Sequence, residues 1–147
     1  MNISQTGTMG QGMVFIPLYA YSASGQGNWS FSAHGTALYQ MSMNNSGGAD
    51  GDNISYSIYF SQGTYTISLL HAVDTNYGIV DFYINGSEVA SHDLYLNGGG
   101  LNVTTNLTGI TVANNGLYEF KVMVDGKNAS SSGYVVAFMA ISLYRTA

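Results

Sequence analysis

Charged side chains are scarce in this sequence. Of 147 residues, 3 are Lys or Arg and 8 are Asp or Glu, so 7% of the chain is charged, against about 25% in an ordinary soluble domain. Three basic groups cannot neutralise a series of phosphates, which excludes nucleic acid as a partner. The net charge of −5 also disfavours an anionic membrane surface. Ser, Thr, Asn and Gly stand where Lys and Glu usually do, so the surface is expected to be neutral and polar.

Cysteine is absent and proline occurs once, so the chain has no disulfide and no thiolate metal ligand. No apolar run approaches the ~20 residues that cross a bilayer, which predicts no membrane insertion. Yet 46% of the residues are hydrophobic, too many for a disordered chain. Because the segment 2–12 is polar and lacks a basic secretory signal, we expect a single domain, residues 1–147, excised from a longer chain.

Strand patterns recur along the whole chain, and no stretch of ten residues holds a helical period. The clearest alternation runs through 54–60 and 65–71, which are predicted to form a hairpin. A second hairpin is predicted around Asn85-Gly86, a pair typical of type I′ turns. The last strand, 134–144, is almost continuously apolar and is expected to lie centrally in its sheet.

Eight to ten short strands separated by turn signals indicate an all-β fold. We expect an antiparallel two-sheet β-sandwich, a jelly roll spanning residues 1–147. Two polar stretches with clustered glycines, 44–52 and 97–109, are predicted to be exposed loops.

Eight of the thirteen asparagines stand in the Asn-x-Ser/Thr pattern of N-glycan acceptors. The chain holds 17 Ser and 11 Thr, so chance would place roughly two or three acceptors among its asparagines. The acceptors are Asn2, Asn28, Asn44, Asn53, Asn85, Asn102, Asn106 and Asn128. The excess favours a glycosylated exterior protein, and the alternative is accidental motifs in an Asn-, Ser- and Thr-rich β protein.

Groups able to carry catalysis or hold a metal are few. The histidines are His34, His71 and His92, and no nucleophile motif such as Gly-x-Ser-x-Gly surrounds a serine. The segment Asp50-Gly-Asp52 resembles half of a calcium loop but lacks the bidentate glutamate, so a tight turn is favoured over a metal site. We therefore expect no catalytic residue, no metal and no cofactor.

Aromatic side chains carry more information, because 12 Tyr, 6 Phe and 1 Trp are present. Rings at strand ends and in loops are expected to be exposed, and these are Trp29, Tyr77, Tyr83, Tyr95 and Tyr134. A sugar ring can stack on such a face while nearby amides and carboxylates bind its hydroxyls. The candidate sugar-binding residues are Asp74, Asn76, Tyr77, His92, Asp93 and Tyr95. The alternative is that the tyrosines decorate a β surface or a subunit interface.

Four segments carry a resemblance to known families: Gly63-Thr-Tyr-Thr-Ile67, Tyr77-Gly-Ile-Val-Asp-Phe-Tyr-Ile-Asn-Gly86, Gly126-Lys-Asn-Ala-Ser-Ser-Ser-Gly-Tyr134 and Ile141-Ser-Leu-Tyr-Arg145. Together they resemble the jelly-roll domains of virion surface proteins, including phage appendages and the vertex turrets of archaeal icosahedral viruses. The first two are also similar to β-sandwich carbohydrate-binding modules.

The first resemblance implies a non-enzymatic structural domain of a capsid turret or spike on the virion surface, glycosylated and involved in host attachment. Its partners would be copies of itself, other virion proteins and host-surface glycans. The second implies a carbohydrate-binding module of a secreted, extracellular polysaccharide-degrading enzyme. The sequence leaves both hypotheses open.

Overall fold

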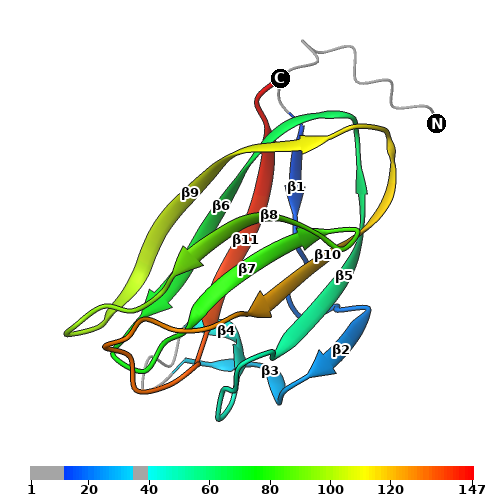
Figure 1. Ribbon diagram of the computed structural model, residues 1–147. Coiled ribbons are helices and arrows are strands. Elements are labelled where there is room, and N and C mark those ends of the chain that lie inside the picture. The colour runs from blue at the N-terminus through cyan, green and yellow to red at the C-terminus, as the bar shows by residue number, and fades with distance from the viewer. Residues whose placement is uncertain (1–11, 35–39) are drawn as a thin grey trace.

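The computed structural model describes residues 12–34 and 40–147, which form two antiparallel sheets packed face to face (Figure 1). The strands are β1 (Met13–Phe15), β2 (Ala23–Gln26), β3 (Trp29–Ala33), β4 (Met41–Asn45), β5 (Asn53–Phe60), β6 (Gly63–Val73), β7 (Ile79–Ile84), β8 (Ser87–Asp93), β9 (Gly100–Val112), β10 (Gly116–Val124) and β11 (Ala137–Arg145). In these residues no helix is long and apolar enough to cross a bilayer. The predicted all-β sandwich is confirmed.

The order of the strands is that of a jelly roll. The first sheet runs β3-β4-β11-β6-β9, with β1 beside β11, and the second runs β2-β5-β10-β7-β8. Counted from β4, the first sheet holds the first, eighth, third and sixth strands, and the second holds the second, seventh, fourth and fifth. This is the double Greek key of a jelly roll. As predicted, the apolar last strand is central, because β11 lies between β4 and β6.

The core lies between the sheets and is rich in aromatic rings. Phe82 of β7 stacks on Phe120 of β10, with ring centroids 6.0 Å apart, and meets Phe138 of β11 edge-on at 6.1 Å. All three side chains are buried, and burial of each contributes about 1.5–3 kcal/mol. Since Phe138 belongs to the opposite sheet, this cluster joins the two layers.

The hairpin predicted at Asn85-Gly86 is confirmed. Asn85 has a φ of 46° and Gly86 a φ of 80°, the left-handed backbone that a type I′ turn requires at both central positions. Strands β7 and β8 pair across this turn. Asn85 also accepts a hydrogen bond through Oδ1 from the Glu119 backbone N–H over 2.8 Å, which fastens the turn to β10.

The hairpin predicted from 54–60 and 65–71 is wrong. Strand β5 pairs with β2 and β10 in the second sheet, whereas β6 pairs with β11 and β9 in the first. The short connection between them therefore crosses from one layer to the other. Both strands turn every second side chain into the shared core, and this alternation is the same for a hairpin and for a crossing between layers.

The segment 97–109 is not the long loop that was predicted. Strand β9 begins at Gly100 and pairs with β6 over most of its length, so only the turn before it is irregular. Asn102, Thr104, Asn106 and Thr108 are exposed on this edge strand, and their polarity gives the sequence the composition of a loop. The segment 44–52 is likewise shorter as a loop, because β4 extends to Asn45.

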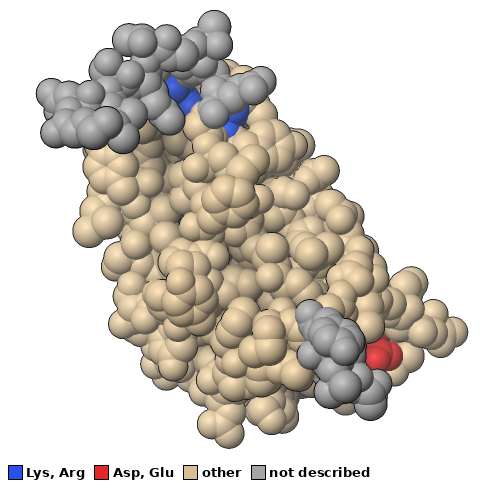
Figure 2. All heavy atoms as spheres, turned by 180° about the vertical axis from the view of Figure 1, so that it is seen from behind, with Lys and Arg blue, Asp and Glu red and all other residues tan. Residues whose placement is uncertain are grey.

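Charge is divided unequally between the sheets. Among the described residues, the six strands of the first sheet contain a single charged side chain, Arg145. The second sheet carries Asp81, Glu88, Asp93, Glu119 and Lys121 within its strands. Seen from behind, the molecule shows blue and red atoms only toward its ends (Figure 2). The first sheet is thus the layer with almost no charged side chains, and the charges within strands lie mainly on the second sheet.

Candidate functional site

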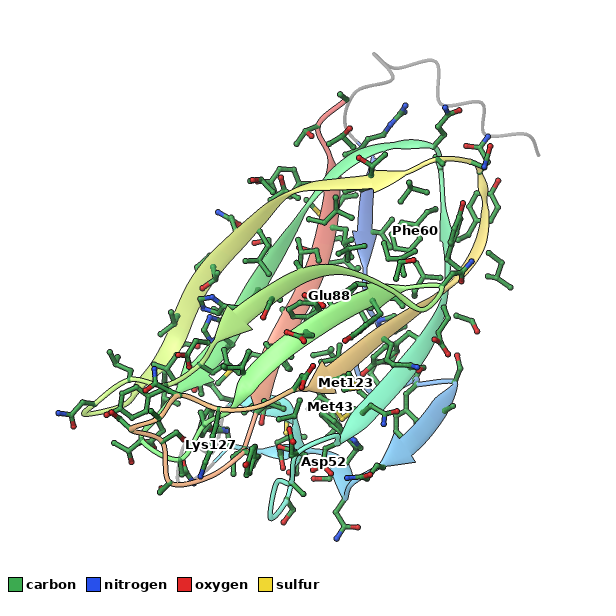
Figure 3. All side chains as sticks on the ribbon, in the orientation of Figure 1. Met43, Asp52, Phe60, Glu88, Met123 and Lys127 are labelled. Carbon is green, nitrogen blue, oxygen red and sulfur yellow. The ribbon has the colours of Figure 1, made fainter. Side chains whose placement is uncertain are left out.

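Four described loops gather at the end of the sandwich opposite the C-terminus (Figure 1). They are residues 46–52, 74–78, 94–99 and 125–136. Figure 3 shows Asp52 and Lys127 at this end and Phe60 toward the other. Because each loop connects strands of the rigid sandwich, this end is where the fold displays side chains free of sheet packing.

A buried polar network fixes two of these loops to each other. The Asn45 amide Nδ2 donates to Asp52 Oδ2 over 2.9 Å and to the Tyr134 backbone oxygen over 3.1 Å. Asn45 Oδ1 accepts from the Val136 N–H over 2.8 Å, and Asp52 Oδ2 accepts from the Ala49 N–H over 2.9 Å. Asn45 and Asp52 are both buried. The network thus ties the β4–β5 loop to the segment that enters β11.

Loop 74–78 is fixed to the same segment by its backbone. The Val135 N–H donates to the Asn76 oxygen over 3.1 Å, and the Gly78 N–H donates to the Val135 oxygen over 3.0 Å. The Ser131 hydroxyl donates to the Tyr77 oxygen over 2.7 Å. The loops 46–52, 74–78 and 125–136 are therefore connected by hydrogen bonds into one surface, with residues 131–135 in the middle.

A cavity of about 230 Å³ opens in this surface. Its lining residues come from the end of β3, from β4 and the following loop, and from the two loops just described: Ser32, Ala33, His34, Asn44, Asn45, Ser46, Gly47, Tyr77, Val135 and Ala137. No Asp, Glu, Lys or Arg is among these described lining residues. Ser46 and Gly47 also border a second hollow of about 410 Å³ beside Asp52. The lining therefore offers hydroxyl, amide and imidazole groups, which suit hydrogen bonding to an uncharged ligand.

Tyr77 is buried rather than exposed as predicted, with 5% of its surface accessible. Its ring packs with the core and lines the cavity. Burial raises the pKa of the Tyr77 hydroxyl to about 12, and the nearby Asp74 carboxylate adds to the effect. The phenol therefore keeps its proton at neutral pH and remains able to donate a hydrogen bond.

Four more of the predicted sugar-binding residues lie beside this surface, on the outer side of loop 74–78. Asp74 and Tyr95 form an isolated parallel bridge. Asp93 accepts from the Tyr95 N–H over 2.9 Å and from Asn128 Nδ2 over 2.8 Å. The Asn76 side chain is exposed and Tyr95 is half-buried. The structure thus brings Asp74, Asn76, Asp93 and Tyr95 to the loop end, where Asp93 also braces the loops.

His92, the sixth candidate, belongs to a different cluster. Its ring meets that of His71 edge-on, with centroids 5.4 Å apart, and its Nε2 lies 3.3 Å from Thr105 Oγ1. His71 is fully buried, with Nδ1 3.0 Å from the Ala72 oxygen and Nε2 2.9 Å from Thr105 Oγ1. In neutral His71, Nδ1 donates to that carbonyl and Nε2 accepts from Thr105, which leaves the hydroxyl oxygen to accept from His92.

Burial lowers the pKa of both imidazoles. The Ala72 carbonyl partly opposes this for His71, and Asp93 partly opposes it for His92. His71 and Thr105 belong to the first sheet and His92 to the second. The cluster is therefore a hydrogen-bonded link between the two layers rather than a part of the loop-end surface.

Several residues of the loop end have no signal in the sequence as site residues. His34 and Asn44 line the cavity only because β3 pairs with β4 and β4 with β11. Lys127 Nζ lies 4.9 Å from the centroid of the Tyr134 ring, a cation–π contact that gives this half-buried ring a fixed neighbour. Charge beside an aromatic residue in a Gly- and Ser-rich loop is too common a pattern to identify such a contact.

The glycan-acceptor asparagines divide into two groups. The exposed ones are Asn28, Asn85, Asn102 and Asn106, and the half-buried ones are Asn44, Asn53 and Asn128. Asn2 lies outside the described residues.

No family model and no curated protein matches the sequence, but solved structures resemble the fold. One is the CBM36-1 domain of a multidomain xylanase from the hindgut metagenome of Trinervitermes trinervoides, with a TM-score of 0.63 and 17% identity over 93% of this chain and 98% of that one. Another is a CBM36 carbohydrate-binding module in complex with calcium and xylotriose, with a TM-score of 0.58 and 20% identity over 90% and 98%. A third is the CBM6cm-2 module of Cellvibrio mixtus lichenase 5A in complex with cellotriose, with a TM-score of 0.59 and 17% identity over 91% and 98%. At these identities the likeness concerns the β-sandwich fold.

Among the described residues, no three His, Asp or Glu side chains converge as a metal site would require of them. Asp50 Oδ1 accepts from the Gly126 N–H over 2.7 Å, and Asp52 Oδ2 is engaged by Asn45 and Ala49. Both carboxylates therefore hold loops together.

Proposed function

We propose that this chain is a carbohydrate-binding module whose ligand is a neutral oligosaccharide held at the loop end of the sandwich. The observation that carries the proposal is the cavity of about 230 Å³ lined by Tyr77, His34 and Asn44 without a described charged residue. It is smaller than the roughly 300–1,000 Å³ of sites for drug-sized ligands, which suits one sugar ring. The adjoining hollow beyond Ser46 and Gly47 gives room for a second ring.

The chemistry of the lining suits sugar hydroxyls. The Tyr77 hydroxyl is protonated, because its pKa is about 12, and it donates a hydrogen bond. Amide and hydroxyl side chains such as Asn44 and Ser32 both donate and accept. Charged ligands find no described counter-ion in the cavity lining, and burial of an unpaired charge is costly. A neutral polyhydroxyl compound is the ligand class that this lining satisfies.

The resemblance to solved carbohydrate-binding modules supports this hypothesis over the virion-surface one. Two of those structures bind xylotriose and cellotriose, and one belongs to a multidomain xylanase. We propose accordingly that the chain acts without catalysis of its own, as the sugar-anchoring part of a secreted polysaccharide-degrading enzyme. A role in a virion turret, and self-association there, stays a prediction from sequence resemblance.

Calorimetric titration with xylotriose, cellotriose and laminaritriose tests the proposal. We expect saturable binding of at least one trisaccharide and at least tenfold weaker binding by Tyr77→Phe, which removes only the hydroxyl of this lining residue. The matched control is Tyr59→Ala, since Tyr59 is 61% exposed near the end of β5 remote from these loops. Folded protein that binds none of the three sugars, or binding that Tyr77→Phe leaves intact, contradicts the proposed site.

A further inference from the structure

The amide nitrogens of the acceptor asparagines differ in availability. Asn44 Nδ2 donates to Ser32 Oγ over 3.3 Å, Asn53 Nδ2 to the Gly51 oxygen over 2.9 Å, and Asn128 Nδ2 to Asp93 Oδ2 over 2.8 Å. An N-linked glycan replaces one of the two hydrogens of this nitrogen, and in these acceptors the fold already uses one of them. All three side chains are half-buried. These acceptors are therefore less available to a glycan than an exposed asparagine.

The two acceptors of β9 have the opposite geometry. In Asn102-Val-Thr104 and Asn106-Leu-Thr108, the asparagine and the threonine are two positions apart, and all four residues are exposed. Alternate residues of a strand share a face, so from Asn106 onward acceptor and hydroxyl point outward together while Leu107 turns inward. Asn102 uses Oδ1 to accept from Gln40, which leaves its nitrogen available.

These two are also the acceptors that end in threonine. The patterns at Asn2, Asn28, Asn44, Asn53, Asn85 and Asn128 all end in serine. A threonine is the better hydroxyl residue for the glycan-transferring enzyme, because its methyl group restricts the side chain to fewer conformations. Exposure leaves four acceptors, Asn28, Asn85, Asn102 and Asn106, and the threonine pattern selects Asn102 and Asn106 among them.

Among the described strands, β9 is an edge strand whose outer backbone groups have no partner strand. It is the last strand of its sheet and spans 13 residues. Such an edge exposes unpaired backbone groups, and proteins normally protect it with charged residues or proline against pairing with another chain. Neither occurs within β9. Irregularities in its pairing with β6, one of them between Tyr65 and Ile67, shorten the regular edge without removing it.

We propose that Asn102 and Asn106 are N-glycan attachment sites and that their glycans shield the free edge of β9. In the transfer, Asn Nδ2 forms a bond to the anomeric carbon of a lipid-pyrophosphate-linked oligosaccharide. The bond from that carbon to the phosphate oxygen breaks, the lipid pyrophosphate leaves with the electron pair, and the amide loses one proton. No oxidation or reduction takes place. The inference is independent of the sugar-binding site, which is tested on protein without glycans.

The test is secretion of the chain from a yeast that carries out N-glycosylation, followed by mass spectrometry of the intact protein before and after enzymatic glycan release. We expect glycans on Asn102 and Asn106, and loss of one glycan in each of Thr104→Ala and Thr108→Ala. The matched control Ser46→Ala, which destroys the Asn44 acceptor, should leave the mass of the attached glycans unchanged. Bare Asn102 and Asn106 in the folded, secreted protein, or glycans on the half-buried acceptors, overturn the proposal.

Sedimentation of the glycan-free double variant tests the shielding role separately. The variant Thr104→Ala/Thr108→Ala keeps both asparagines and changes two exposed side chains, so the sandwich is expected to fold. We expect it to associate at concentrations at which the glycosylated protein is monomeric. A glycan-free variant that stays monomeric at those concentrations overturns the shielding role.

Discussion

Asn45 Nδ2 and Asp52 Oδ2 form a buried hydrogen bond of 2.9 Å between the end of β4 and the loop that precedes β5. The same amide holds the backbone on both sides of Val135 through the Tyr134 oxygen and the Val136 N–H. A single side chain therefore connects the two loops that border the candidate sugar site. Because the polar atoms of the Asn45 side chain all have hydrogen-bond partners, the two loops are held in fixed positions and the surface has a defined shape.

The first prediction concerns Asn45→Ala. The substitution removes three hydrogen bonds and leaves the Val136 N–H and Asp52 carboxylate short of a buried partner, so it should destabilise the protein by about 3 kcal/mol. Urea unfolding measures this change. The control Asn114→Ala, at an exposed position, should shift the free energy of unfolding by less than about 0.5 kcal/mol. A cost below about 1 kcal/mol for Asn45→Ala would show that the network does not hold the loops.

The second prediction concerns pH and the link made by His71, Thr105 and His92. Burial lowers both histidine pKa values below the unfolded value of about 6.5, so below that pH the unfolded chain binds more protons. Stability is therefore complete above about pH 6.5 and decreases as the pH falls toward the folded pKa values. The urea midpoint should be constant from about pH 8 to 7 and fall as the pH is lowered below about 6.5.

The variant His92→Gln isolates this effect, because glutamine can still donate to Thr105 but does not titrate. Its urea midpoint should fall less steeply with decreasing pH than that of the wild type. Identical slopes for the variant and the wild type would exclude the histidine link as the source of the pH dependence.

The third prediction concerns Gly48, which lies against the segment that enters β11. A Cβ at this position would be 2.5 Å from the Tyr134 oxygen and 2.8 Å from the Val135 nitrogen, both backbone atoms. Gly48→Ala must therefore push the two loops apart and should shift the amide resonances of residues 134–136. Gly47→Ala is the comparison, since a Cβ there meets nothing within 4 Å and costs only the strain of its φ of 78°. Undisturbed resonances in Gly48→Ala would contradict the close approach.

Side-chain alternation was sufficient to predict the class of fold but not all strand partners. The Asn85-Gly86 turn is decided by two adjacent residues, and it was correctly predicted. The connection before Gly63 was not, because inward alternation in β5 and β6 is equally compatible with one sheet or two. Strand β9 was missed for a related reason, since Asn106 and Thr108 point outward from an edge and so resemble loop residues.

The candidate site was predictable only in part. Asp74 and Tyr95 meet at the loop end because each follows a strand that ends there. Tyr77 was expected to be an exposed platform, yet Val135 and the cavity wall, which come from segments distant in the sequence, bury it. The bond from Asn45 to Val136 spans 91 residues, and no local pattern can reveal a contact of that kind.

The central claim is tested most directly by nuclear magnetic resonance titration of the ¹⁵N-labelled protein, made in bacteria without glycosylation, with xylotriose, cellotriose and laminaritriose. The account predicts saturable shifts at the amides of Ser46, Gly47, Tyr77 and Val135, with no change at Lys121 on the second sheet. No shift with any of the three sugars, or shifts confined to the outer faces of the sheets, would contradict it.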